Sequence, residues 1–216
     1  MTDPRLATLR ACYTGVVHDV MRAMGLRDFT LPPRLRPLDA SGVLAGPAWT
    51  LEGRIDETAD AHETLVAWTG LLSKAPAGHV WACQPHNHRL ALMGELSAET
   101  LHARGVLGCV VDGGLRDANF ILDLGFPVWR VFHTPRDVVG AWLPTATEVK
   151  IVIGEVAITP GDWLHGDRDG MVRIPAARLD EVIAASQEAM QKENKVRSAI
   201  LAGTDPQEAY LQHGKF

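Results

Sequence analysis

The sequence lacks several features that would place it quickly in a class of protein. Its 216 residues carry a net charge of −5 and contain no basic block of the kind that binds nucleic acid. No apolar run reaches the roughly 18 residues that a membrane-spanning helix needs. The N-terminal stretch also lacks the apolar core of a secretory signal. We therefore expect a cytoplasmic protein with no membrane and no nucleic-acid partner.

Cysteine is scarce, and the short motifs of several common enzyme classes are missing. Cys12, Cys83 and Cys109 are odd in number and share no metal-type spacing, which predicts free thiols in a reducing compartment. The chain has no glycine-rich phosphate loop, G-x-S-x-G elbow, paired-cysteine motif or internal repeat. The sequence therefore does not indicate the classes that these motifs define.

The residues that are present predict one sizeable globular domain over residues 1–216. Hydrophobic residues make up 46% of the chain and charged residues 22%, which is enough apolar material to bury a core. Apolar spacing is helical near both ends, and strands and helices alternate between them. A long amphipathic helix is expected over about 176–202, followed by a short tail. The pattern predicts a layered α/β domain with a mixed central sheet.

Periodicity and turn residues predict the individual elements. Helices are expected over 6–25 with an interruption at Thr14-Gly15, over 62–74, within 90–104, and over 115–124. Strands are expected over 41–54, 78–83, 106–111, 127–132 and 148–158, with two more around the turns at 160–162 and 169–170. Gly46-Pro47 should break the first strand, because glycine and proline rarely share a central strand. The helix over 62–74 is expected to bury Leu65, Val66, Leu71 and Leu72.

The stretch from Gly94 to Asp117 contains the strongest candidates for a functional site. It ends in a glycine pair followed by Arg116 and Asp117. One carboxylate can anchor a magnesium-like ion that keeps most of its waters, and a guanidinium fork matches a substrate carboxylate. These residues therefore suggest a metal-dependent enzyme acting on a small keto acid. On spacing alone, however, the favoured interpretation is a helix-start charge at Asp117 beside a solvated arginine, because adjacent Arg-Asp pairs are common.

Other polar residues have both a functional and a structural interpretation. Gly94-Glu95 could begin a helix whose free amides hold an anion, or could be a packing glycine beside an exposed acid. His86 and His88 could bind metal on one strand face, although a solvated turn is favoured because no third ligand follows. Asp167 and Asp169, followed by Gly170, resemble the start of a calcium loop, but the later spacing fails and a hairpin turn is preferred.

Taken together, these residues resemble the RraA-like family. That family includes class II 4-hydroxy-4-methyl-2-oxoglutarate aldolases, which also decarboxylate oxaloacetate, and the regulator of ribonuclease activity A. The most specific match is an acid after a glycine, twenty intervening residues, and then Arg-Asp, which here are Glu95 and Arg116-Asp117. Supporting segments are GVLAGPAWT, FPVW and GDWLHGDRDGMVRIP. The resemblance runs from about Val16 to Gly203.

The resemblance implies a swivelling-type α/β fold that assembles as a homotrimer or hexamer, with sites between subunits. Asp117 would anchor Mg²⁺ or Mn²⁺, and Arg116 would contact the substrate. Glu95 corresponds to the acid of the glycine-acid pair. A glutamate from the C-terminal helix of the neighbouring subunit, matched by Glu193, would join the water shell of the metal. The substrate carboxylate would be held by backbone amides of Gly94, Glu95, Leu96 and Ser97.

The activity that this resemblance implies is a metal-dependent carbon–carbon lyase. It would cleave the C3–C4 bond of a small 2-keto acid and release pyruvate through a metal-stabilised enolate, by aldol cleavage, by oxaloacetate decarboxylation, or by both. Departures from the family pattern, including Met93, Ser97, Trp81 and the three histidines at 86, 88 and 102, leave the substrate open. Two alternatives remain: a non-catalytic regulator that docks on a ribonuclease, and a same-fold metal enzyme that dehydrates or tautomerises a related acid.

Overall fold

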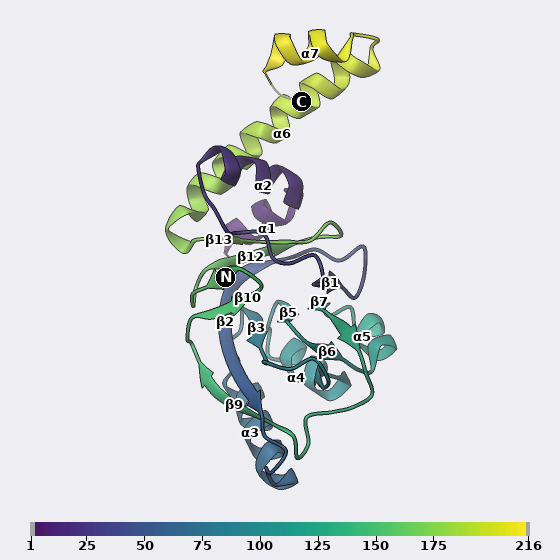
Figure 1. Ribbon diagram of the computed structural model, residues 1–216. Helices are drawn as coiled ribbons and strands as arrows, with labels where there is room; N and C mark the ends of the chain where they lie inside the picture. Colours follow the sequence, from purple (N-terminus) through teal and green to yellow (C-terminus); the bar gives the residue numbers. More distant parts are fainter. Residues whose placement is uncertain (1–2, 215–216) are drawn as a thin grey trace.

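A computed structural model describes residues 3–214, and one long, curved strand organises it (Figure 1). This strand, β2 (Leu44–Ile55), pairs in parallel with β3 (Val80–Gln84) along one edge. Along the other edge it pairs antiparallel with β12 (Trp163–Gly166) and then with β9 (Trp142–Thr147). The main sheet has the order β1-β7-β5-β3-β2-β12-β13, with β9 beside β2. The predicted mixed α/β architecture is confirmed.

The remaining strands complete this sheet and form two smaller ones. The main sheet also contains β1 (Arg36–Pro37), β5 (Gly108–Val111), β7 (Val128–Arg130) and β13 (Met171–Ile174). A three-stranded parallel sheet contains β4 (Ala91–Met93), β6 (Gly114–Leu115) and β8 (Phe132–His133). The third sheet is the hairpin of β10 (Ile151–Ile153) and β11 (Val156–Ile158).

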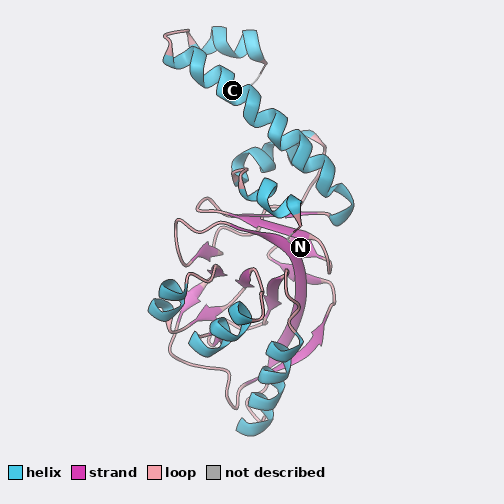
Figure 2. Ribbon diagram, turned by 180° about the vertical axis from the view of Figure 1, so that it is seen from behind, coloured by secondary structure: helices cyan, strands magenta, loops and turns pink. Residues whose placement is uncertain are grey.

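The helices form two groups at different ends of the sheet, as Figure 2 shows. The first group packs at the β12–β13 end: α1 (Pro4–Arg10), α2 (Thr14–Ala23) and α6 (Leu179–Leu201), the last following a 3₁₀ turn at Ala176–Arg178. The second group contains α3 (Ala61–Lys74), α4 (Glu95–Ala103) and α5 (Ala118–Leu124). Within residues 3–214, no helix is both long and apolar enough to cross a membrane.

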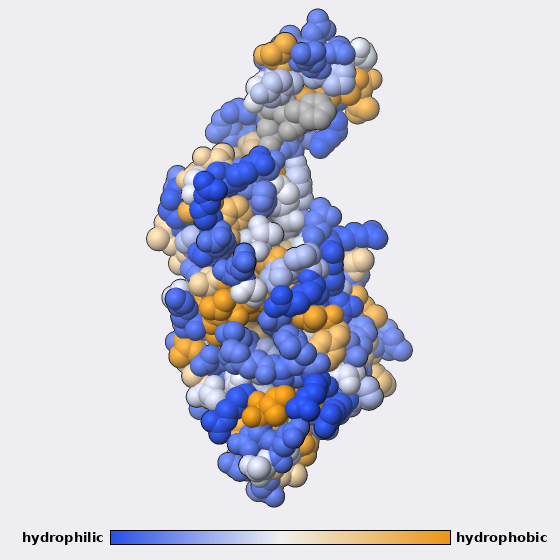
Figure 3. Space-filling view, viewed as in Figure 1, coloured by the Kyte–Doolittle hydropathy of each residue, from blue (hydrophilic) through white to orange (hydrophobic). Residues whose placement is uncertain are grey.

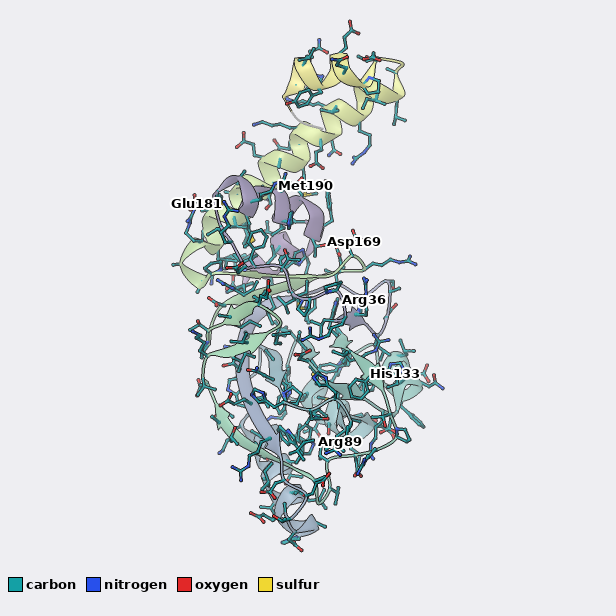
Figure 4. All side chains as sticks on the ribbon, in the orientation of Figure 1. Arg36, Arg89, His133, Asp169, Glu181 and Met190 are labelled. Atoms are coloured by element: carbon teal, nitrogen blue, oxygen red, sulfur yellow. The ribbon has the colours of Figure 1, made fainter. Side chains whose placement is uncertain are left out.

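The end of α6 and the last helix, α7 (Pro206–His213), project away from the sheet as an arm (Figure 1). In Figure 3 this arm shows apolar side chains among polar ones. Leu201, Tyr210 and Leu211 are exposed there. Nearer the sheet, α6 is packed against α2, and its partly buried Met190 (Figure 4) joins the apolar cluster beneath these helices.

The strand β2 runs through Gly46 and Pro47 without a break, so the predicted interruption is wrong. The Ala48 amide donates to Asp162 on the β12 side, at 2.7 Å. Since successive residues of a strand face opposite edges, the missing N–H of Pro47 falls on the β3 side. Pairing with β3 begins only at Ala48, and no ladder hydrogen bond is lost. An added Cβ at Gly46 would lie 2.5 Å from Leu107 Cδ1 and 3.2 Å from Val80 Cγ2, so a larger residue would have to displace these side chains.

The buried face of α3 also differs from the predicted one. Its buried residues are Thr64, Trp68, Leu71 and Leu72, whereas Leu65 is 44% exposed and Val66 is 56% exposed. The error is one of helical phase, because Trp68 turns inward to meet Trp81 and Trp142 at ring-centroid distances near 6 Å. Leu65 is consequently placed at the rim of a cavity.

The predicted single strand over 148–158 is instead the hairpin of β10 and β11. Ile153 pairs with Val156 across a two-residue turn at Gly154 and Glu155. Gly154 has φ +65°, a conformation that such tight hairpin turns favour and that glycine adopts without steric cost. One long strand and a hairpin of two short strands would show the same alternation of apolar residues along 149–158. The periodicity of the sequence therefore could not distinguish the two structures.

Asp167 belongs to a hairpin turn, as expected, and it also caps a distant helix. The Asp167 amide donates to the Gly170 carbonyl at 3.0 Å, which closes the turn between β12 and β13. Its carboxylate accepts hydrogen bonds from the Thr14 amide at 2.8 Å and the Thr14 hydroxyl at 2.6 Å. These bonds satisfy the N-terminus of α2, because Tyr13 supplies no side-chain cap. Asp169, labelled in Figure 4, lies exposed at the tip of the same turn.

Candidate active site

Two parallel strands bring the predicted site residues together at their carboxyl ends. β4 ends at Met93 and leads through Gly94 into α4, while β6 leads through Arg116 and Asp117 into α5. The Arg116 amide donates to the Met93 carbonyl at 2.9 Å and extends the pairing of the two strands. The glycine-acid pair and the Arg-Asp pair, separated by twenty residues in the sequence, therefore lie side by side.

The carboxylate of Asp117 is directed toward α4 and not toward its own helix. Asp117 occupies the N-cap position of α5 in a left-handed conformation, φ +55°, and makes no capping bond there. Its Oδ2 instead accepts a hydrogen bond from the Glu95 amide at 3.0 Å. This arrangement differs from a simple helix-start charge. Left-handed backbone at a non-glycine residue is strained and clusters at functional sites, although aspartate tolerates it better than most.

Arg116 is held between two carboxylates. Its Nη1 donates to Asp137 Oδ2 at 3.1 Å, and its Nε lies 3.4 Å from Asp117 Oδ2. Asp137 also accepts the Val139 amide through Oδ1 at 3.2 Å, so the loop that carries it is tied to the guanidinium. Asp137 was not predicted, because the segment around it carries no recognisable motif. The alternative of a simply solvated arginine is not what the structure shows.

A cavity of about 530 Å³ opens beside these residues, and we call it the α3–α4 cavity. One end is polar and contains Gly94, Glu95, Arg116, Asp117 and Asp137. Most of the other lining residues are apolar side chains of α3, α4 and the loop after β8: Leu65, Trp68, Leu72, Leu96, Val138 and Val139.

The start of α4 contributes donors to the polar end. The Glu95 amide is already engaged by Asp117. Within residues 3–214, the Leu96 and Ser97 amides, which occupy the first turn of α4, have no hydrogen-bond acceptor. Unsatisfied first-turn amides attract anions. The Ser97 hydroxyl accepts a hydrogen bond from the Trp68 indole at 2.9 Å, so its side chain positions the aromatic wall of the cavity.

Gly94 leaves room for the carboxylate and the guanidinium, and a side chain here would displace them. An added Cβ would lie 2.7 Å from Asp117 Oδ2 and 3.1 Å from both Cγ and Nε of Arg116. The backbone of Gly94 is extended, with φ −146°, so the requirement is one of space and not of conformation.

The donors available for a metal at this site are carboxylate oxygens. Over residues 3–214, no group of three or more His, Cys, Asp or Glu side chains is arranged to hold an ion. Asp117, with Glu95 and Asp137 lining the same cavity, is an oxygen-only set. That chemistry suits a hard ion such as Mg²⁺, which can bind through one or two carboxylates and waters. It does not suit zinc, which favours nitrogen and sulfur ligands.

Glu193 is not brought to Asp117 within the chain. It lies on α6 in a groove formed with α2, beside Tyr13, Val16 and Ile200. Figure 1 shows α6 at the other end of the molecule from α4. Its expected role through a neighbouring subunit stays a prediction.

The three histidines noted in the sequence lie outside the α3–α4 cavity. His86 and His88 line a separate polar pocket with Arg34 and Asp112, in the turn between β3 and β4. The Arg34 guanidinium binds Asp112 at 2.8 and 3.0 Å in a bidentate pair. His102 is exposed on α4, where its ring packs edge-on to Phe126.

A fourth histidine, His133, was missed and lies next to the site. It shares a shallow hollow with Arg116 and Asp117; Figure 4 labels His133. Partial burial of the ring and the nearby Arg130 guanidinium lower the pKa of His133. Arg130 Nε donates to His133 Nε2 at 2.8 Å, which requires the neutral ring. His133 therefore supplies no positive charge to the site at neutral pH.

The cysteines are structural. All three are free and buried, and burial raises the pKa of the Cys83 and Cys109 thiols well above the usual value. Buried neutral thiols are poor nucleophiles and poor metal ligands. The site chemistry therefore rests on carboxylates, amides and one guanidinium.

Comparison with known proteins identifies the family. The sequence model of the RraA-like family, described as Aldolase/RraA, matches residues 14–173, and the chain belongs to that family. It is 33% identical over 121 residues to the uncharacterized protein MJ0644 of Methanocaldococcus jannaschii, covering 55% of this chain and 56% of that protein. It is 23% identical over 186 residues to a putative 4-hydroxy-4-methyl-2-oxoglutarate aldolase of Halalkalibacterium halodurans, covering 84% and 83%.

A solved structure supports the same assignment. Streptomyces coelicolor RraAS2, described as an unusual member of the RNase ES inhibitor RraA protein family, superimposes with a TM-score of 0.79 at 26% identity. The match covers 90% of this chain and 96% of RraAS2. Two of the curated relatives are matched over only 56% and 33% of their own lengths.

Proposed function

We propose that the protein is a divalent-metal-dependent lyase that cleaves the C3–C4 bond of a 2-keto acid and releases pyruvate. The observation that carries this proposal is the meeting of Asp117, Arg116 and the first turn of α4 at one end of the α3–α4 cavity. Membership of a family described as Aldolase/RraA supports it. Relatives with putative aldolase names at 23–30% identity add further support.

The chain's own groups can bind and orient such a substrate. The Leu96 and Ser97 amides would hold the substrate carboxylate at the start of α4. The Arg116 guanidinium would face the keto oxygen, where negative charge grows as the C3–C4 bond breaks. Fixed donors of this kind are commonly worth about 3 kcal/mol of transition-state stabilisation. Asp137 keeps the guanidinium in place through its 3.1 Å hydrogen bond.

We propose Mg²⁺ or Mn²⁺ as the cofactor, held at Asp117. Such an ion supplies Lewis-acid stabilisation to a developing enolate. The hydrogen bond from the Glu95 amide to Oδ2 holds the Asp117 carboxylate in place for this task.

Aldol cleavage also requires a base for the proton of the C4 hydroxyl. Glu95, which lines the same cavity, could hold the water that accepts this proton. Decarboxylation of oxaloacetate has no such proton to remove. A Glu95→Gln variant is therefore expected to lose aldol cleavage more strongly than decarboxylation.

The direct test is pyruvate release from a panel of 4-hydroxy-2-keto acids and oxaloacetate, with and without Mg²⁺. We expect release to need the ion and to fall at least a hundredfold in Asp117→Asn, which keeps the shape of the side chain and removes its charge. Asp123→Asn on α5, outside the cavity lining, is the matched control and should retain activity. Undiminished turnover in Asp117→Asn and in the presence of a chelator would refute the metal mechanism.

We further propose a homotrimer or hexamer in which Glu193 of a neighbouring subunit completes the site. The projecting α6–α7 arm with its exposed Leu201 and Leu211 supports an intersubunit role for the C-terminal helices. Light scattering would measure the mass of the assembly. A monomer that is fully active would contradict this proposal.

A ribonuclease regulator is the second candidate, because RraAS2 is described within an RNase inhibitor family. It predicts inhibition of purified RNase ES at a stoichiometric ratio, with no keto-acid cleavage. The lyase proposal predicts the reverse pattern in the same two assays.

A further inference from the structure

The residues that line the α3–α4 cavity indicate which substituent the substrate carries, which the proposed reaction alone does not specify. Its ionisable lining residues are Glu95, Asp117, Asp137 and Arg116, so three carboxylates face one guanidinium. That guanidinium is already within 3.1 Å of Asp137 and 3.4 Å of Asp117. The residues that this subunit contributes to the lining include no lysine or histidine. Within the subunit, a second substrate carboxylate would therefore find no cation that is not already paired.

The other lining residues are mainly apolar, apart from the hydroxyl residues Thr69, Ser97 and Thr100. Trp68, Leu72 and Val138 are 6–7% exposed, and Leu65 and Leu96 form the more open rim at 44% and 77%. The polar atom of the Trp68 indole is satisfied by Ser97 at 2.9 Å, so the ring presents only carbon to a ligand. Burying an ionised carboxylate against such a surface without a partner is strongly unfavourable.

The apolar wall is held at a set position relative to the catalytic end. Asp137 accepts both the Arg116 guanidinium and the Val139 amide, and Gly140 donates to the Thr64 hydroxyl of α3 at 3.0 Å. The loop that follows β8 thus connects Arg116 to α3. A volume of about 530 Å³ lies in the range of sites for ligands much larger than pyruvate.

We propose that the preferred substrate is a 4-hydroxy-2-keto acid with an uncharged alkyl or aryl substituent on C4, and not a dicarboxylic acid. The keto-acid group would lie at the polar end, and the substituent would lie against Leu65, Trp68 and Val139. In the reaction the C3–C4 bond breaks and its electron pair stays on C3. The C4 hydroxyl loses its proton as it becomes a carbonyl, and a proton is added at C3. The products are pyruvate and an apolar aldehyde or ketone.

This inference rests on the proposed lyase activity, and a substrate series tests it. The series compares methyl, propyl and phenyl groups at C4 with a carboxylate at C4, using Mg²⁺ and measuring pyruvate release. We expect kcat/KM to rise about fourfold for each buried methylene, and to be at least tenfold higher for phenyl than for carboxylate. Equal or faster cleavage of the dicarboxylic acid would overturn the inference and leave the lyase intact. No release from any acid would overturn both.

A charge placed on the apolar rim provides the second arm. Leu65→Arg should lower kcat/KM for the phenyl substrate about tenfold and raise it for the dicarboxylic acid. Leu122→Arg is the matched control, because Leu122 is 42% exposed on α5 and does not line the cavity. It should leave both values unchanged. A Leu65→Arg enzyme with the substrate preference of the wild type would refute the placement of the substituent.

Binding can be measured independently of turnover. The acid 4-methyl-2-oxopentanoate has the proposed apolar end and no C4 hydroxyl, while 2-oxoglutarate has a carboxylate there. Isothermal titration calorimetry in the presence of Mg²⁺ should give at least tenfold tighter binding for the first acid. Tighter binding of 2-oxoglutarate would overturn the inference.

Discussion

Replacing Gly94 by alanine would test the geometry of the site without changing its charge. The new Cβ would be 2.7 Å from Asp117 Oδ2 and 3.1 Å from two side-chain atoms of Arg116. The 2.7 Å contact is closer than real Cβ atoms approach, so the carboxylate must move, and the two 3.1 Å contacts require the arginine side chain to shift by a few tenths of an ångström. The atoms that clash belong to side chains that are 35% and 39% exposed, and they can shift without displacing the backbone.

The two effects of this substitution differ in size. Displacement of reacting groups by about 1 Å commonly lowers rates about a hundredfold, which corresponds to about 2.7 kcal/mol of transition-state stabilisation. Stability should change much less. Gly94 is extended and occupies the N-cap of α4, where alanine is less favourable than glycine by about 1 kcal/mol.

The assay combines pyruvate release with urea unfolding of the same protein sample. Gly70→Ala is the control, because Gly70 lies within α3 and an added Cβ meets no atom within 4 Å. It should retain activity and gain up to about 1 kcal/mol of stability from helix propensity. A Gly94→Ala enzyme within threefold of the wild-type rate would refute the argument from crowding. A loss of activity that is fully explained by unfolding of the variant protein would also refute this argument.

Two further predictions concern stability. Asp167→Ala should lower the free energy of unfolding by about 1–2 kcal/mol, because it removes both hydrogen bonds to Thr14 at the start of α2. The control, Asp169→Ala at the exposed tip of the turn, should change the free energy of unfolding by less than about 0.5 kcal/mol. Equal effects of the two substitutions in urea unfolding would contradict the capping role. Burial lowers the pKa of His165 below its usual 6.5, so the unfolded chain binds a proton that the folded chain resists. The free energy of unfolding should therefore be highest above pH 6.5 and should decrease as the pH falls below it. In His165→Gln this decrease should be smaller, and the part that remains should come from His133, whose pKa is also lowered.

The helix-start reading of Asp117 shows where local reasoning stops. Asp117 does occupy the N-cap position of α5, as a helix-start charge would. Its carboxylate binds the Glu95 amide, 22 residues away, because β4 and β6 pair in parallel and end together. The spacing between the two motifs was visible in the sequence, but the direction of the side chain depends on strand pairing.

The errors in the predicted elements have a common cause. Gly46-Pro47 was expected to break β2, and Leu65 was expected to be buried. Both predictions assumed that a strand or helix packs against the same neighbour along its whole length. β2 changes partners at Pro47, and α3 turns Trp68 toward the two other tryptophans. Neighbours that are distant in sequence decided both outcomes.

The sequence by itself determined the mixed α/β architecture, most of the elements and the pairing of Gly94-Glu95 with Arg116-Asp117 as the candidate site. The architecture and the elements follow from periodicity and glycine positions, which are local properties of the chain. The pairing of the two motifs follows from the resemblance to the RraA-like family. Only the tertiary structure brought Asp137 to Arg116, joined Trp68 to Ser97, and placed Leu65 at the rim of the cavity. The two hydrogen bonds join residues that are 21 and 29 positions apart, and no local pattern determines which way these side chains face after packing.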